Sequence, residues 1–147
     1  MKKMMICLSV LLVLYCFGFS YAKESQLSQE SLKNITNEIV RPYFVALKSG
    51  DIETLKRFMT KEMYDEQRVL LEQNKEYPNF LKRIYRDANF TIGSMEETGN
   101  GIVVNTVIKY PDGRQRQMKL YLKNDDKKLK NQTSDRSWKI SGKPDPK

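Results

Sequence analysis

The sequence contains no histidine, and its two cysteines, Cys7 and Cys16, both lie near the start of the chain. Without histidine, serine and cysteine nucleophiles lack their usual base, so Ser–His and Cys–His hydrolysis are excluded. Zinc sites of the usual histidine and cysteine ligands are excluded as well, because the chain beyond Cys16 contains neither residue. That part of the chain must therefore fold around a hydrophobic core, without a disulfide bond.

The first 22 residues have the pattern of a secretory signal peptide. Lys2 and Lys3 precede an apolar run over residues 4–19, which only one serine and one glycine interrupt. Small residues at positions 20 and 22 suit a signal peptidase, so we predict cleavage between Ala22 and Lys23. This pattern predicts export, either to the periplasm or out of the cell.

An uncleaved membrane anchor is the alternative interpretation of this segment. Its apolar stretch over residues 6–22 has 17 residues, at the lower limit for crossing the hydrocarbon core of a bilayer. In both cases residues 23–147 lie outside the cytoplasm. They are enough for one domain with its own core and too few for two.

Basic residues are concentrated toward the C-terminus. Residues 101–147 contain 12 lysines and arginines and 5 aspartates, whereas residues 23–100 are nearly neutral. A predicted anion-binding surface consists of Lys119, Lys123, Lys127 and Lys128. An exported protein would bring it to an anionic polymer or a lipid surface. Nucleic acid is a poorer candidate, because no nucleic-acid-binding motif accompanies the charge.

The first part of the chain beyond the signal segment reads as helical. From Leu32 to Leu47 apolar residues recur three and four positions apart, which predicts a helix with one buried face. Pro42 interrupts this helix without ending it. Gly50 closes it, and Asp51 is the predicted N-cap of a second helix.

Two further helices are predicted before the chain changes character. Thr60 is the predicted N-cap of a helix that carries Met63 and Leu71, and Pro78 suits the first turn of a fourth helix. After Asp87 the apolar residues alternate, which is typical of strands. Strands are predicted over residues 90–97, 102–110, 115–123 and 137–141.

The two central strands predict their own register. If Tyr110 faces Arg114 across the turn, then Ile108 faces Arg116 and Thr106 faces Met118. The apolar residues of both strands then share one face. The predicted fold is therefore α+β, with N-terminal helices packed on an antiparallel sheet.

The segment VRPYFVALKSGDIETLKRFMTKEMYDE, residues 40–66, resembles the opening of the nuclear transport factor two-like superfamily, also called cystatin-like or ketosteroid-isomerase-like. The residues that match its pattern are Ala46, Gly50, Asp51, Leu55, Trp138 and Lys139. The resemblance implies a curved antiparallel sheet and helices that together form a cone. It implies no single function, because the superfamily includes enzymes, binding modules and assembly domains.

Tyrosines are the best candidates for a ligand site in such a cone. The predicted ligand-binding residues are Tyr43, Tyr64, Tyr85, Thr106, Tyr110 and Arg116. Ordinary core packing is the alternative role for the tyrosines, and a solvated or salt-bridged side chain is the alternative for Arg116. No catalytic residue is predicted, since the inner face of the central hairpin carries no acid.

The leading hypothesis is an exported, non-catalytic binding or interaction domain of the cell envelope. Its partner is an unknown small ligand or an envelope protein, and no cofactor or metal is predicted. A homodimer is left open. The alternative is a small isomerase-like or cyclase-like enzyme, which needs a buried carboxylate in a tyrosine-lined pocket. Glycosylation sequons at Asn34, Asn89 and Asn131 matter only in a eukaryotic host.

Overall fold

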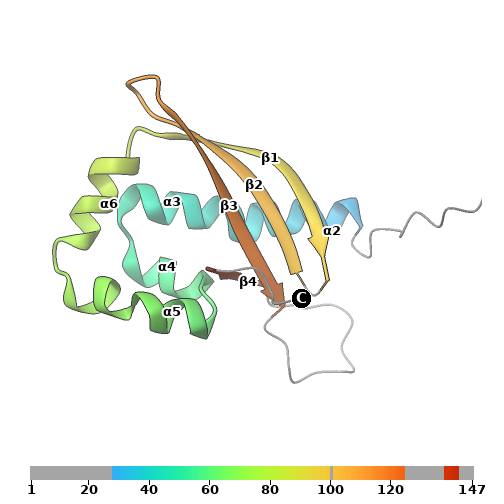
Figure 1. The fold of residues 1–147 in the computed structure, drawn as a ribbon, viewed down its shortest axis with the longest axis horizontal. Helices are drawn as coiled ribbons and strands as arrows, with labels where there is room; N and C mark the ends of the chain where they lie inside the picture. The colour runs from blue at the N-terminus through green and yellow to red at the C-terminus, as the bar shows by residue number, and fades with distance from the viewer. Residues whose placement is uncertain (1–27, 100, 125–137, 143–147) are drawn as a thin grey trace, which may run out of the picture.

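The computed structural model describes residues 28–99, 101–124 and 138–142 of the 147-residue chain. The predicted signal segment and cleavage site, with Ala22 and Lys23, lie outside the described residues. The described elements form helices packed against a four-stranded antiparallel sheet (Figure 1). The α+β prediction is thus confirmed.

A long helical segment opens the fold. It consists of α2 (Gln29–Ile35), a π-helical turn η2 (Thr36–Val40) and α3 (Arg41–Ser49). Pro42 explains the change of helical type, because it has no N–H group and its ring crowds the carbonyl four residues earlier. The Arg41 N–H accordingly bonds to the Thr36 carbonyl five residues back. The predicted interruption without termination is confirmed.

The end of α3 is fixed by Gly50, which adopts a left-handed conformation with φ 64°. A Cβ atom at this position would lie 2.4 Å from the Pro78 carbonyl oxygen, so the glycine also lets α6 (Tyr77–Tyr85) approach α3. Asp51 then caps α4 (Ile52–Phe58) by accepting a hydrogen bond from the Thr54 N–H at 3.0 Å. Both predicted roles are confirmed.

The remaining helices follow without long loops. They are α5 (Lys61–Arg68), a second π-helical turn η3 (Val69–Gln73) and α6 (Tyr77–Tyr85). Thr60 caps α5 as predicted, because its hydroxyl accepts a hydrogen bond from the Met63 N–H at 3.3 Å. The π-helical turn η3 was not predicted, since no proline or other breaker marks it in the sequence.

The sheet consists of β1 (Asn89–Thr98), β2 (Gly101–Lys109), β3 (Gln115–Asn124) and β4 (Trp138–Ser141), in that order across the sheet. All neighbours are antiparallel. The predicted register is confirmed, because Thr106 pairs with Met118 and Ile108 pairs with Arg116. The strands twist and bend as they cross in front of α3 (Figure 1).

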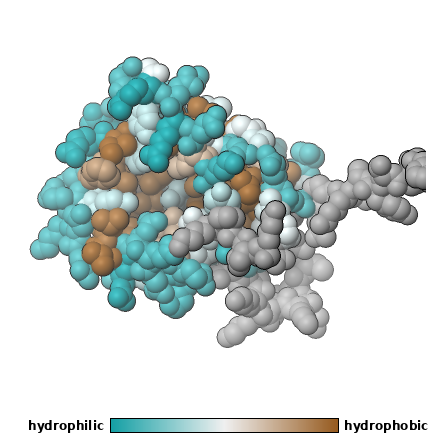
Figure 2. Space-filling view, viewed as in Figure 1, coloured by the Kyte–Doolittle hydropathy of each residue, from teal (hydrophilic) through white to brown (hydrophobic). Residues whose placement is uncertain are grey.

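The core lies between the inner face of the sheet and the helices. Its largest fully buried apolar members come from η2, from α4 and from every strand except β1: Val40, Leu55, Ile102, Val104, Ile108, Leu122 and Ile140. Met118, Leu120 and Leu122 all face this core, with Leu120 and Leu122 buried and Met118 half-buried. In the space-filling view a band of hydrophobic side chains crosses the middle of one face between hydrophilic margins (Figure 2).

The two edges of the sheet differ. At the β4 edge, Met59 forms a parallel bridge with Ile140, and the Thr60 N–H donates to the Ile140 carbonyl at 2.8 Å. At the β1 edge, no strand of the described residues pairs with the outer side of β1. The ladder between β1 and β2 shifts register between Ile92 and Met95, which is a β-bulge.

Candidate functional site

An aromatic layer joins the helices to the hairpin end of the sheet. Phe44 of α3 stacks on Phe90 of β1, with ring centroids 4.3 Å apart and an interplanar angle of 13°. Phe90 also lies against Tyr85 of α6 at 5.9 Å, and Phe44 against Tyr43 at 6.1 Å. Tyr43 and Tyr85, two of the predicted site residues, are therefore linked through the two phenylalanines.

The hydroxyl groups of this region influence one another. Burial raises the pKa of Tyr43 well above its ordinary value of 10.0, and the nearby Tyr77 and Tyr85 raise it further. Burial also raises the pKa of Tyr85, with a smaller contribution from Tyr110, while Arg116 acts in the opposite direction. The four tyrosines and Arg116 come from α3, α6 and the β2–β3 hairpin. We call these five residues the tyrosine cluster.

The register of the sheet explains why Arg116 belongs to the cluster. Phe90, Ile108 and Arg116 face one another across β1, β2 and β3, so their side chains lie in one row on the inner face. Ile108 is buried, whereas Arg116 is exposed at the end of the row. No carboxylate contributes to the pKa shift of Tyr43, Tyr77 or Tyr85. The cluster therefore presents hydrogen-bond donors and a positive charge.

Thr106 occupies the next row of the same face, with Ile92 and Met118 on either side. Its side chain is only 2% exposed. Its hydroxyl is the single buried side-chain polar atom of the described residues that has no hydrogen-bond partner. The prediction that Thr106 faces the interior beside Arg116 is confirmed, although its contact with a ligand stays a prediction.

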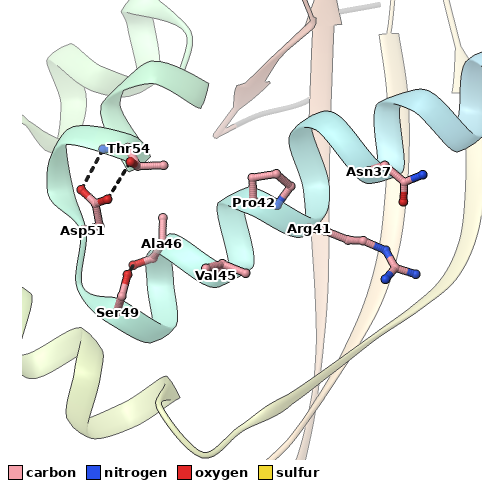
Figure 3. Close-up of a pocket in the computed structure, with 8 residues that line it drawn as sticks. All are labelled: Asn37, Arg41, Pro42, Val45, Ala46, Ser49, Asp51 and Thr54. Carbon is pink, nitrogen blue, oxygen red and sulfur yellow. Dashed lines mark hydrogen bonds between the residues drawn. The ribbon is translucent and has the colours of Figure 1, made fainter.

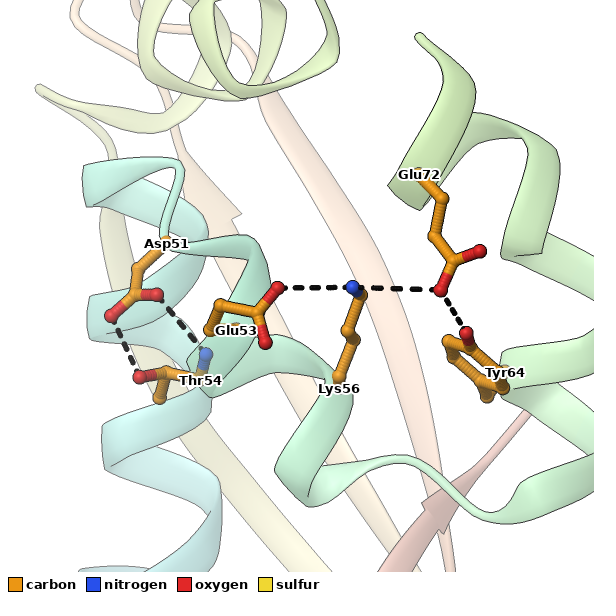
Figure 4. A network of polar contacts seen from close by, with 6 residues as sticks. All are labelled: Asp51, Glu53, Thr54, Lys56, Tyr64 and Glu72. Carbon is orange, nitrogen blue, oxygen red and sulfur yellow. Dashed lines mark hydrogen bonds and ion pairs between the residues drawn. The ribbon is translucent and has the colours of Figure 1, made fainter. Parts of the chain in front are cut away.

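Tyr64 lies apart from the cluster, in a polar network between α4, α5 and η3 (Figure 4). Its hydroxyl donates to Glu72, and this hydrogen bond raises the pKa of Tyr64 and lowers the pKa of Glu72. Lys56 lies between two carboxylates, 3.0 Å from Glu53 and 3.7 Å from Glu72. Tyr64 therefore has a local structural partner and does not join the other predicted site residues.

The predicted anion surface can be placed in part. Lys119 and Lys123 of β3 lie on the outer face of the sheet, opposite the helices, and Lys119 is exposed. Lys139 pairs with Lys123 and shares this face, and its ammonium group donates to the Arg57 carbonyl. Lys127 and Lys128 lie outside the described residues.

A shallow groove that we did not predict runs along the outer side of α3 (Figure 3). It has a volume of about 420 Å³ and is lined by Asn37, Arg41, Pro42, Val45, Ala46, Ser49, Asp51 and Thr54. Val45 is 63% exposed within it. The signal in the sequence is the spacing of Asn37, Arg41, Val45 and Ser49 at intervals of four, which places them on one helix face.

The described residues provide no buried acidic side chain. Every aspartate and glutamate among them is exposed, so none has the buried setting that raises a carboxylate pKa toward neutrality. No group of three or more potential metal ligands occurs in the same residues. None of their helices combines the length and apolar character that a membrane crossing requires.

Comparisons with known proteins give one weak match. No family model and no curated protein matches the sequence. Among solved structures, the chain is similar to a Campylobacter jejuni protein whose crystal structure is described, provisionally, as that of an NTF2-like transpeptidase. The two share 12% identity and a TM-score of 0.48, over 71% of this chain and 95% of the other. A likeness at this level assigns neither a family nor an activity.

Proposed function

We propose that this protein is an exported, non-catalytic domain of the nuclear transport factor two-like type, which binds a small organic acid at the tyrosine cluster. One observation carries the proposal: Arg116 lies on the inner face in one row with Phe90, on which Tyr85 packs, and no carboxylate is among the groups that shift the pKa of Tyr85. The signal-peptide pattern of the first 22 residues supports the export part.

The donors define the ligand. A guanidinium only donates hydrogen bonds, whereas phenol hydroxyls both donate and accept them. A ligand at Arg116 must therefore bring acceptors, and a carboxylate suits its fork best. The rings of Phe90 and Tyr85 offer an apolar surface for the body of the ligand. An aromatic carboxylic acid matches both requirements.

Binding without turnover agrees with the distribution of acids. Proton transfer in a tyrosine-lined site needs a carboxylate base whose pKa is raised by burial. Each described carboxylate is exposed, and the shifted pKa values of Asp51, Glu72 and Asp112 are all lowered. The enzyme alternative therefore finds no base among the described residues.

The proposal is tested by titrating the purified chain with phenylacetate and following binding by calorimetry or NMR. Arg116→Gln should weaken binding about tenfold or more, because it removes a charge-assisted hydrogen bond. Arg57→Gln, which changes an exposed arginine of α4, is the matched control and should leave the affinity unchanged. Equal affinities of the original chain and Arg116→Gln would contradict the proposal, as would turnover of the acid.

A further inference from the structure

The hydroxyl of Thr106 is buried in a setting that gives it nothing to bond. The residue is 2% exposed, and its oxygen has no hydrogen-bond partner, although almost all buried polar atoms in proteins have one. Thr60, which is similarly buried, uses its hydroxyl to cap α5. A valine would fill the space at Thr106 without an unmet hydrogen bond. The hydroxyl therefore has a cost that packing alone does not explain.

The position of Thr106 relates it to the tyrosine cluster. It precedes Ile108 by two residues on β2, and Ile108 pairs with Arg116. Thr106 and Arg116 are thus diagonal neighbours on one face of the hairpin, about 7–8 Å apart by the usual spacing of such pairs. A ligand held by Arg116 therefore needs to extend only one row along the sheet to reach the buried hydroxyl.

Met118 is the side chain that could give way to such a ligand. It pairs with Thr106 and follows Arg116 by two residues on β3. It is half-buried, whereas Leu120, two residues further along β3, is buried. A methionine side chain has three rotatable bonds and adapts readily to a new neighbour. The residue that neighbours both Arg116 and Thr106 on the inner face is thus an adaptable one.

We infer that the Thr106 hydroxyl binds a second polar group of the ligand, so that the protein selects organic acids with a hydroxyl or carbonyl at the end opposite the acid. This inference rests on the proposed function and adds the specificity of the same site. A site that holds an otherwise unpaired polar atom discriminates strongly against ligands that leave it unpaired. Thr106 is then a specificity residue, and Arg116 supplies general affinity.

The experiment compares phenylacetate with 4-hydroxyphenylacetate, which differ only in a hydroxyl opposite the acid. Their dissociation constants are measured by calorimetry for the purified full chain. The hydroxylated acid should bind about three- to tenfold more tightly, which is the usual net contribution of one hydrogen bond. Thr106→Val should abolish this preference, and Thr106→Ser, which keeps a hydroxyl, should retain it. Arg116→Gln should weaken both acids and leave their ratio unchanged.

The possible outcomes separate the two proposals. If Arg116→Gln weakens both acids but the original chain does not distinguish them, or if Thr106→Val retains the preference, the role of Thr106 is wrong and the proposed function stands. If neither acid binds in a way that depends on Arg116, the proposed function is wrong, and so is the role of Thr106 in specificity. Unfolding does not confuse the result, because Thr106→Val is expected to melt at a higher temperature than the original chain.

Discussion

Phe44 of α3 and Phe90 of β1 stack nearly parallel, with their ring centroids 4.3 Å apart. This pair connects the long helical segment to the strand at the edge of the sheet. Phe90 also contacts Tyr85, so the same stack positions α6. The aromatic layer is therefore both the support of the tyrosine cluster and a joint between the two halves of the fold.

Replacing Phe44 tests this joint. Phe44 is 5% exposed, so Phe44→Ala should lower the free energy of unfolding by about 3–5 kcal/mol, the usual cost of truncating a buried phenylalanine. Phe80→Ala is the matched control, since Phe80 is 42% exposed, and it should cost less than about 1.5 kcal/mol. Urea denaturation of both variants measures the difference. Equal losses would show that the stack contributes no more than a surface ring.

Replacement by valine should have opposite effects on stability at Thr60 and at Thr106. Thr60→Val should destabilise by about 1 kcal/mol, because it removes the cap of α5. Thr106→Val should stabilise by about 1 kcal/mol, because it removes a buried hydroxyl without a partner. Thermal unfolding of the two variants beside the original chain checks the signs. A loss of stability in Thr106→Val would mean that its hydroxyl is satisfied in solution.

Substitutions at Gly50 and Gly113 distinguish the cost of steric overlap from the cost of backbone strain. Both have positive φ, but a Cβ at Gly50 would lie 2.4 Å from the Pro78 carbonyl oxygen, whereas one at Gly113 would meet nothing within 4 Å. Gly113→Ala should cost about 1 kcal/mol from strain alone. Gly50→Ala should cost about 2–4 kcal/mol, since overlap with the backbone adds to the strain. Chemical denaturation compares the two, and similar costs would argue against close packing of α3 and α6.

The raised pKa of Tyr43 predicts that the folded chain loses stability at alkaline pH. The folded chain holds the Tyr43 proton above the ordinary pKa of 10.0, so the unfolded chain releases its proton first. The contribution of the protonated Tyr43 to the free energy of unfolding is fully present below pH 10.0. It is lost as the pH rises from there toward the higher folded pKa, by up to about 1.4 kcal/mol per pH unit.

Tyr43→Phe cannot ionise and should lose stability less steeply above pH 10.0. Denaturation midpoints measured for both chains from pH 8 to 11 give the two slopes. The other tyrosines and the lysines titrate in both chains and cancel from the comparison. Parallel slopes would show that the Tyr43 hydroxyl reaches solvent.

Local rules account for most of the fold. Asp51, Thr60 and Gly50 were recognised as helix ends because capping and left-handed glycine depend on short-range geometry. The register of β2 and β3 followed from one turn and the period of two. The π-helical turn η3 was missed, because its residues are ordinary helix formers and only tertiary packing distinguishes it.

The site was predicted less completely, for a physical reason. Alternation shows which face of a strand a residue occupies, so Thr106 and Arg116 were correctly placed together. It does not show which helices meet that face. Tyr64 therefore could not be separated from Tyr43 and Tyr85, and Tyr77 was missed although it belongs to the cluster. The orientation of whole helices decides these cases, and it depends on contacts distant in the sequence.

The bridge between Met59 and Ile140 has a consequence for assembly. Met59 is already bridged to Ile140, and the Thr60 N–H already bonds to the Ile140 carbonyl, so another chain cannot pair with β4 at that point. Extension of the sheet by another polypeptide would have to start at β1 or beside the part of β3 that does not pair with β4 in the described residues. The bulge between Ile92 and Met95 interrupts β1, so a segment docked on that strand could pair with only a few residues before its register is lost.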